Sequence, residues 1–144
     1  MCAYKPKTWV EKRDLEKQPE VKRIDVDFAD MKKGDKMLIA TPAIVDTYVR
    51  HIPKGKEGSL VQMRKDLAAE YQADKTCPVT SGIFLRIVAE AAYEEYLQGK
   101  PISKITPFWR IINQKSPVAK KLTFGTEFLL AQRRKEKLGL PAAK

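Results

Sequence analysis

Cysteine and histidine are scarce in this sequence: its 144 residues include two cysteines, Cys2 and Cys77, and a single histidine, His51. No Cys-x-x-Cys pair is present, so neither a disulfide framework nor a Cys/His metal site is expected. The sequence also lacks an apolar run long enough to cross a bilayer, and residues 1–17 lack the apolar core of a signal peptide. These absences predict a cytoplasmic protein with reduced thiols and no membrane partner.

Side chains that could carry covalent or acid–base chemistry are few as well. No glycine-rich phosphate loop of the Walker or dinucleotide type occurs. Glu94 and Glu95 are neighbours in a helical segment, and adjacent helical positions do not face each other. Cys77 stands before a proline with no histidine near it in sequence, so nothing there favours a thiolate. We expect a protein without enzymatic activity and without a cofactor.

Positive charge is what the sequence has in excess. Lysine and arginine outnumber aspartate and glutamate by 28 to 18, which gives a net charge of +10 and a pI of about 9.6. A small basic domain attracts polyanions because its contacts to phosphates release counterions. Nucleic acid is therefore an expected partner. An acidic protein surface is the alternative, since many basic proteins bind no nucleic acid.

The pattern divides the chain into residues 1–40 and 41–140. The first part is a basic N-terminal extension, expected to be partly ordered, with a short helix at 12–17 and an edge strand at 21–28. The second part is expected to be a domain of mainly α structure with a short β element. The starts of three helices are predicted from N-cap residues: Thr41-Pro42 for the first, Ser59 with Gln62 for the second, and Thr80 or Ser81 for the third. A fourth helix is predicted at 127–138, ending at Gly139.

The third helix, predicted to end at Gly99, has two distinct faces. On a helical wheel Arg86 lies opposite the expected buried stripe, and Gly82 and Ala89 share its outward face, where small residues would let another surface approach. A strand is expected at 107–112, so that the helices and the strand give a winged helix-turn-helix-like, DNA-binding domain. The four apolar residues of the buried stripe are Phe84, Ile87, Val88 and Ala91.

Four stretches occur in an order that resembles a known family: YVRHIPKGK, SGIFLRIVAEA, ITPFWRII and LLAQRRKEKLG. The family is the alkylguanine-DNA alkyltransferases, or methylated-DNA–protein-cysteine methyltransferases, and the likeness is to their DNA-binding domain. The resemblance covers residues 44–139 and is closer still to the alkyltransferase-like proteins. Residues 52–55 match the family's Ile-Pro-x-Gly turn, residues 86–89 its Arg-Ala-Val-Gly, and residues 107–112 its Pro-Cys-His-Arg-Val-Ile.

The sequence departs from the family at the reactive position. In the alkyltransferases the cysteine of Pro-Cys-His-Arg takes the alkyl group from guanine, whereas Phe108 and Trp109 stand here at the cysteine and histidine positions. Phenylalanine cannot accept an alkyl group, so the resemblance implies no repair reaction. The alkyltransferase-like proteins also lack that cysteine, and they bind alkylated DNA without repairing it. The gap from Arg86 to Phe108 is longer than in the family, with the extra residues expected at 98–104.

The resemblance implies a function for these residues. The protein would be a monomer that binds double-stranded DNA, turns an alkylated guanine out of the duplex, and marks it for a nucleotide-excision repair protein. Arg86 would fill the space left by the nucleotide, Phe108 and Trp109 would pack the flipped base, and Arg110 would brace the strand. The residues expected at the DNA interface are Ser81, Gly82, Arg86, Ala89, Phe108, Trp109 and Arg110.

Each assignment has an ordinary structural alternative. Phe108 and Trp109 could be core aromatics, Arg86 could be a solvated arginine, and residues 133–135 could be a basic helix end that suits the macrodipole. Two other functions stay open. One is a winged-helix DNA-binding, architectural or transcription factor without lesion preference, and the other is a protein-interaction module with an acidic partner.

Overall fold

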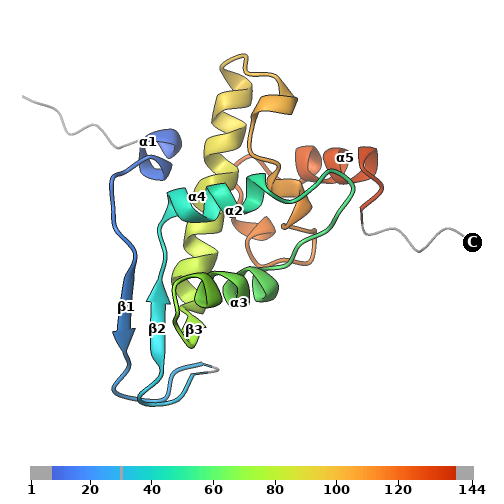
Figure 1. Ribbon diagram of the computed structural model, residues 1–144. Coiled ribbons are helices and arrows are strands. Elements are labelled where there is room, and N and C mark those ends of the chain that lie inside the picture. The colour runs from blue at the N-terminus through green and yellow to red at the C-terminus, as the bar shows by residue number, and fades with distance from the viewer. Residues whose placement is uncertain (1–7, 30, 139–144) are drawn as a thin grey trace, which may run out of the picture.

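The computed structural model describes residues 8–29 and 31–138. A small sheet lies beside the helices (Figure 1), and its three strands have the order β1-β2-β3. Strands β1 and β2 are antiparallel, with Glu20 opposite Ile39, whereas β2 and β3 are parallel, with Met37 opposite Lys75. The prediction of a mainly α chain with a short β element is confirmed. The bounds are α1 Trp9–Arg13, β1 Glu20–Arg23, β2 Lys36–Ile39, α2 Pro42–Arg50, α3 Leu60–Glu70, β3 Lys75–Thr76, α4 Pro78–Leu97 and α5 Glu127–Lys135.

Helix α4 runs through the middle of the molecule, with α1 and the sheet on one side and α5 on the other (Figure 1). Its central residues Val88, Ala89 and Ala92 are fully buried in the main hydrophobic cluster. Alanines at these positions let the neighbouring elements come close to the helix axis. None of the helices among the described residues is both long and apolar enough to cross a membrane.

The caps predicted for the second and third α-helices of the chain are confirmed. The Thr41 hydroxyl accepts a hydrogen bond from the Ile44 backbone N–H at 3.2 Å, and Ser59 accepts from Gln62 at 3.0 Å. Proline suits the first position of α2, where a backbone N–H has no helical partner. The second half of the expected capping box is missing, because the Gln62 side chain donates to Asp66 instead.

Other boundaries differ from the prediction. Helix α4 begins at Pro78, so Thr80 and Ser81 lie inside it rather than before it. The Ser81 hydroxyl is buried and donates to the Cys77 carbonyl at 2.6 Å. Ser81 thus forms a hydrogen bond within the first turn of the helix instead of capping it from outside. The N-terminal helix is α1, capped by Thr8, rather than residues 12–17. The end of α4 before Gly99 is confirmed, whereas Gly139 lies outside the described residues.

The strand predicted at residues 107–112 is wrong. Residues Phe108–Arg110 form a 3-10 helix, η2, and no strand occurs between residues 98 and 138. The backbone N–H groups bond within the segment, from Arg110 to the Pro107 carbonyl at 3.1 Å and from Ile112 to the Phe108 carbonyl at 3.0 Å. A run of large apolar residues is compatible with a buried turn as well as with a buried strand. The expected wing after the recognition helix is therefore absent from this segment.

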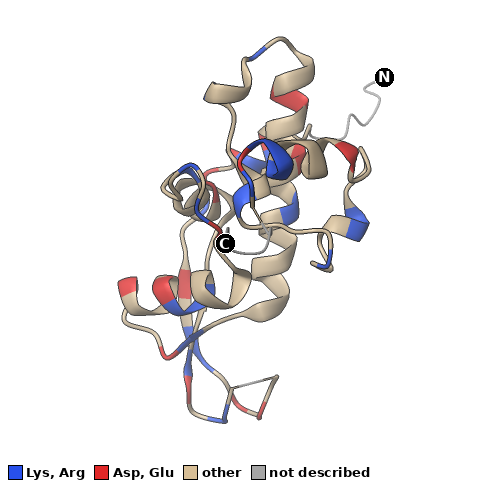
Figure 2. Cartoon of the chain, turned by 90° about the vertical axis from the view of Figure 1, so that its right-hand side faces the viewer, with Lys and Arg blue, Asp and Glu red and all other residues tan. Residues whose placement is uncertain are grey.

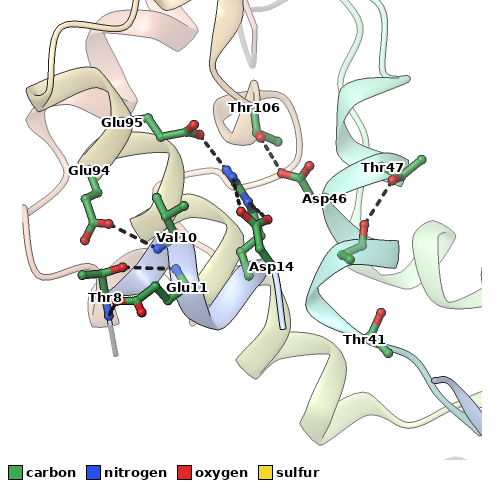
Figure 3. Close-up of polar contacts among 12 residues, drawn as sticks. Thr8, Val10, Glu11, Asp14, Thr41, Asp46, Thr47, Glu94, Glu95 and Thr106 are labelled. Atoms are coloured by element: carbon green, nitrogen blue, oxygen red, sulfur yellow. Dashed lines mark hydrogen bonds and ion pairs between the residues drawn. The ribbon is translucent and has the colours of Figure 1, made fainter. Parts of the chain in front are cut away.

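The part of the chain before residue 41 packs onto the rest. Strand β2 pairs with β3, and Leu38 and Ala40 belong to the main core cluster. Helix α1 is fixed to α4 because Glu94 accepts from the backbone of Trp9 and Val10, and Arg13 pairs with Glu95 at 2.6 Å (Figure 3). The expected domain boundary at residue 40 therefore falls within one sheet and one hydrophobic core, which the two parts of the chain share.

The contribution of helix capping to stability can be tested at Thr41, the N-cap residue of α2 (Figure 3). Replacing Thr41 by alanine leaves the Ile44 N–H without its acceptor, and we expect a loss of about 1–2 kcal/mol in the free energy of unfolding, measured by urea denaturation. The matched control is Thr47→Ala, because Thr47 lies exposed within the same helix. An equal loss in both variants would show that the cap adds nothing.

Candidate nucleic-acid interface

Helix α4 presents one exposed stripe along its N-terminal half. Val79, Gly82, Ile83 and Arg86 follow at helical spacing, and the two apolar side chains are 55% and 51% exposed. A Cβ atom added to Gly82 would meet nothing within 4 Å, so the surface around it is open. These two exposed apolar side chains flank an open glycine and give the face a small apolar surface. The stripe is therefore a candidate contact surface.

Arg86 lies at the end of this stripe, half-buried. Its guanidinium carbon is 5.3 Å from the centre of the Trp9 ring, and its Nε is 3.7 Å from the Glu90 carboxylate, too far for a hydrogen bond. That Nε is enclosed and has no hydrogen-bond partner among the described residues. Glu90 itself is held by Thr123, through the backbone N–H at 2.8 Å and the hydroxyl at 2.6 Å.

Two other predicted interface residues on this helix are buried. Ala89 is inaccessible and belongs to the core cluster, and the Ser81 side chain is 99% enclosed. The expectation that Ala89 shares the outward face of Arg86 is therefore wrong. The predicted stripe combined Val88 and Ala91, which are fully buried, with Phe84 and Ile87, which are only partly buried. Neighbouring elements pack against α4 from several directions. A helical wheel that assumes one buried direction therefore predicts the wrong exposure for residues at the edges of the stripe.

Phe108 is a core residue. Its side chain is completely buried, and its ring lies 5.4 Å from Trp109, 5.8 Å from Phe124 and 6.0 Å from Phe128 between centroids. Tyr93 stacks on Phe124 at 4.0 Å in the same cluster. A base cannot stack on a ring that is covered on all sides. The assignment of Phe108 to the floor of a base pocket is therefore corrected: it supports the site from beneath.

Trp109 and Arg110 converge on one carboxylate. The Trp109 Nε1 donates to Glu136 at 2.6 Å, and the Arg110 Nε donates to the same group at 3.0 Å. Arg110 also donates to the Ile52 carbonyl at 2.7 Å, and the Gly55 N–H donates to Glu136 at 3.0 Å. Arg110 thus braces the turn at 52–55 against η2 and the segment after α5.

The environment of Glu136 favours the ionised carboxylate. Burial by itself would raise the pKa of Glu136, but the hydrogen bonds from Arg110, from the Gly55 backbone and from Trp109 outweigh it. The pKa of Glu136 therefore lies below its ordinary value, and the group is charged at neutral pH. A fixed negative charge here holds the cations around it in place.

A hollow of about 570 Å³ opens beside η2. Trp109 and Arg110 line it, together with the apolar residues Ile102, Ile105 and Pro107. Three further cationic side chains, Arg50, Lys54 and Lys135, are exposed, and Ser103, Gln132 and the ionised Glu136 complete the lining. Arg86 is not part of this lining, so the structure leaves it on the α4 stripe while Trp109 and Arg110 meet at the hollow. Such a site suits a flat apolar group that carries a negative charge.

The basic cluster at 133–135 is divided between two roles. Arg133 is buried, donates to the Trp109 carbonyl at 2.8 Å and pairs with Glu57 at 2.9 Å. Arg134 and Lys135 are exposed. Figure 2 shows Lys and Arg spread over several segments of this face with Asp and Glu among them. Charge alone therefore does not outline an interface, and the hollow and the stripe are better guides.

Sequence reasoning did not identify two residues of the candidate site. Trp9 contacts Arg86 from a helix that the resemblance does not cover, and Gln132 lines the hollow from a helix rich in charge. Comparison with protein-family models, with curated proteins and with solved structures found no match.

The core role of Phe108 leads to a prediction that a base-stacking role would not. Phe108→Ala should lower the free energy of unfolding by about 3–5 kcal/mol, because it leaves a cavity in a close-packed cluster. Phe108→Leu should cost less and leave any DNA affinity of the folded protein unchanged. Phe28→Ala, at a phenylalanine that is 41% exposed, is the control and should unfold like the wild type. Weaker DNA binding by a stably folded Phe108→Leu variant would restore the stacking role.

The depressed pKa of Glu136 leads to a prediction about pH. Its ordinary value is 4.5 and the folded value is lower, so its stabilisation is present above pH 4.5 and is lost as pH falls through the folded pKa. Glu136→Gln should therefore lower Tm at pH 7, and the gap to the wild type should narrow in the acid range. Thermal unfolding followed by circular dichroism measures it, with exposed Glu16→Gln as the control. A gap that stays constant with pH would contradict the charged role.

Proposed function

We propose that this protein binds double-stranded DNA and recognises alkylated guanine by turning the nucleotide into the hollow beside η2. The observation that carries the proposal is the hollow itself. It lies against Pro107, Trp109 and Arg110, within the segment that resembles the alkyl-acceptor motif. Its apolar walls suit a base, and its cationic residues suit the flanking phosphates.

The α4 stripe supports a groove contact. Proteins that unstack a base step often place apolar side chains and an arginine against the minor groove. Val79 and Ile83 are exposed around open Gly82, and Arg86 has no tight hydrogen bond to break before it moves. In this proposal α4 acts as the recognition helix of a helix-turn-helix-like domain, and Arg86 fills the place of the flipped nucleotide.

The proposed action stops at recognition. Phe108 takes the position of the alkyl acceptor and is enclosed in the core, and Cys77 is buried at the start of α4. A buried thiol is out of reach of a base in a duplex. The protein would therefore mark the lesion, as a monomer, for a nucleotide-excision repair protein rather than remove the alkyl group.

One observation favours a second candidate, a general DNA-binding factor. The α4 stripe and the hollow share no residue, so the stripe could contact DNA with the hollow unused. Such a protein would bind plain and alkylated duplexes equally. Its affinity would fall steeply with salt, since phosphate contacts would supply most of the binding free energy.

Two short duplexes that differ by one methyl group on a guanine O6 separate these candidates. We expect fluorescence anisotropy at physiological salt to show tighter binding of the methylated duplex. Arg86→Ala should weaken that binding at least about fivefold, because the gap in the duplex is left unfilled. Arg23→Ala removes the same charge from an exposed arginine on the outer strand β1 and should have little effect.

Each outcome has a clear meaning. Equal affinity for the two duplexes would favour the general DNA-binding factor. Loss of preference in Arg86→Ala, with circular dichroism unchanged, would support the arginine assignment. An equal loss in Arg86→Ala and Arg23→Ala would reduce Arg86 to one phosphate contact among many.

A further inference from the structure

Gln132 on α5 is a buried polar residue with an unused side-chain amide. The residue is 6% exposed and lines the hollow beside η2. No described residue forms a hydrogen bond with its amide, and the amide atoms are not among the fully enclosed ones. The exposed remainder of the side chain therefore faces the hollow.

Other buried polar residues are paired, although the enclosed Arg86 Nε and Thr80 Oγ1 also lack a partner among the described residues. The Ser81 hydroxyl donates to a backbone carbonyl, as does that of Thr76, and the Glu90 carboxylate accepts twice from Thr123. Buried polar groups in folded proteins are nearly always paired, because an unmade hydrogen bond is costly. The Gln132 amide is therefore available to a ligand that enters the hollow.

The surroundings of the amide limit that ligand. The walls combine charged residues with four apolar ones, and among the apolar ones is Trp109, which is 2% exposed and whose own N–H is already given to Glu136. Lys54 and Lys135 at the hollow form no ion pair with any described residue, so their charges remain for an anion. A flat body, one hydrogen-bonding edge and a phosphate together describe a nucleotide.

We propose that Gln132 reads the edge of the base in the hollow, an assignment that rests on the proposed function. An O6-alkylated guanine has no proton on N1, so it presents an acceptor beside the donor of its 2-amino group. The glutamine amide offers the matching pair, with Nε2–H donating to N1 and Oε1 accepting from the amino group. Unmodified guanine has a donor at N1 as well as at its 2-amino group. Its N1–H would therefore face the glutamine N–H, and no hydrogen bond could form there.

This pairing can be tested as a coupling between one protein group and one base group. The variant is Gln132→Leu, and the two duplexes carry O6-methylguanine or O6-methylhypoxanthine, which lacks only the 2-amino group. Wild-type protein should bind the second duplex roughly fivefold more weakly, the worth of one hydrogen bond. Gln132→Leu removes both hydrogen bonds, so it should bind O6-methylguanine more weakly than wild-type protein binds O6-methylhypoxanthine, and it should show no further loss with O6-methylhypoxanthine.

Controls keep the result specific. Gln114→Leu changes an exposed glutamine outside the hollow and should behave like the wild type with both duplexes. Gln132→Met, which is unbranched like glutamine, repeats the test in case leucine disturbs the packing of α5. Thermal unfolding of each variant verifies the fold before binding is measured.

Failure of the two proposals can be told apart. If wild-type protein prefers O6-methylguanine over guanine but Gln132→Leu keeps the full dependence on the 2-amino group, the reading role is overturned and lesion recognition stands. If wild-type protein shows no preference for O6-methylguanine over guanine, both proposals fail. The pairing is established if removal of the 2-amino group weakens binding by the wild-type protein but does not weaken binding by either Gln132 variant.

Discussion

The carboxylate of Glu136 holds together the three segments that shape the hollow. It accepts from Trp109 and Arg110 on η2 and from the backbone at Gly55, and it follows directly after α5. The turn at residues 52–55 and the one-turn η2 are too short to be ordered by their own backbone hydrogen bonds alone. A charged acceptor with several donors provides that order, because charge-assisted hydrogen bonds are stronger than neutral ones. The shape of the candidate base pocket thus depends on one ionised side chain.

The N-terminal part of the chain contacts Arg86 of the α4 stripe, which does not line the hollow. Trp9 lies over Arg86, and Lys12 lies over the same ring at 4.3 Å. Helix α1 has only five residues and is too short to be stable alone. It is held by Glu94 and by the pair of Arg13 with Glu95. The segment that the family resemblance does not cover therefore sets the surroundings of the arginine that the resemblance singles out.

The PFWR segment shows how a site can keep its framework while its central residue changes use. Arg110 ties the loops together, and Trp109 keeps contact with the hollow. Phe108, at the position of the reactive cysteine in the resembling family, points into the aromatic cluster and adds only packing. A side chain of that size gains more from burial among Phe124 and Phe128 than from exposure in an open hollow. In the proposed function, the walls of the hollow and the α4 stripe, rather than Phe108, would contact DNA.

The sequence by itself determined the features that depend on near neighbours in the chain. Thr41, Ser59 and Gly99 mark helix ends because a cap uses a backbone group three residues away or a left-handed turn that glycine adopts freely. Tertiary structure decided which residues are buried. The 3-10 helix at Phe108, the enclosed Ala89 and the open amide of Gln132 all depend on segments far along the chain. Apolar periodicity cannot foresee them, since it describes a helix with one buried side and this core surrounds its central helix.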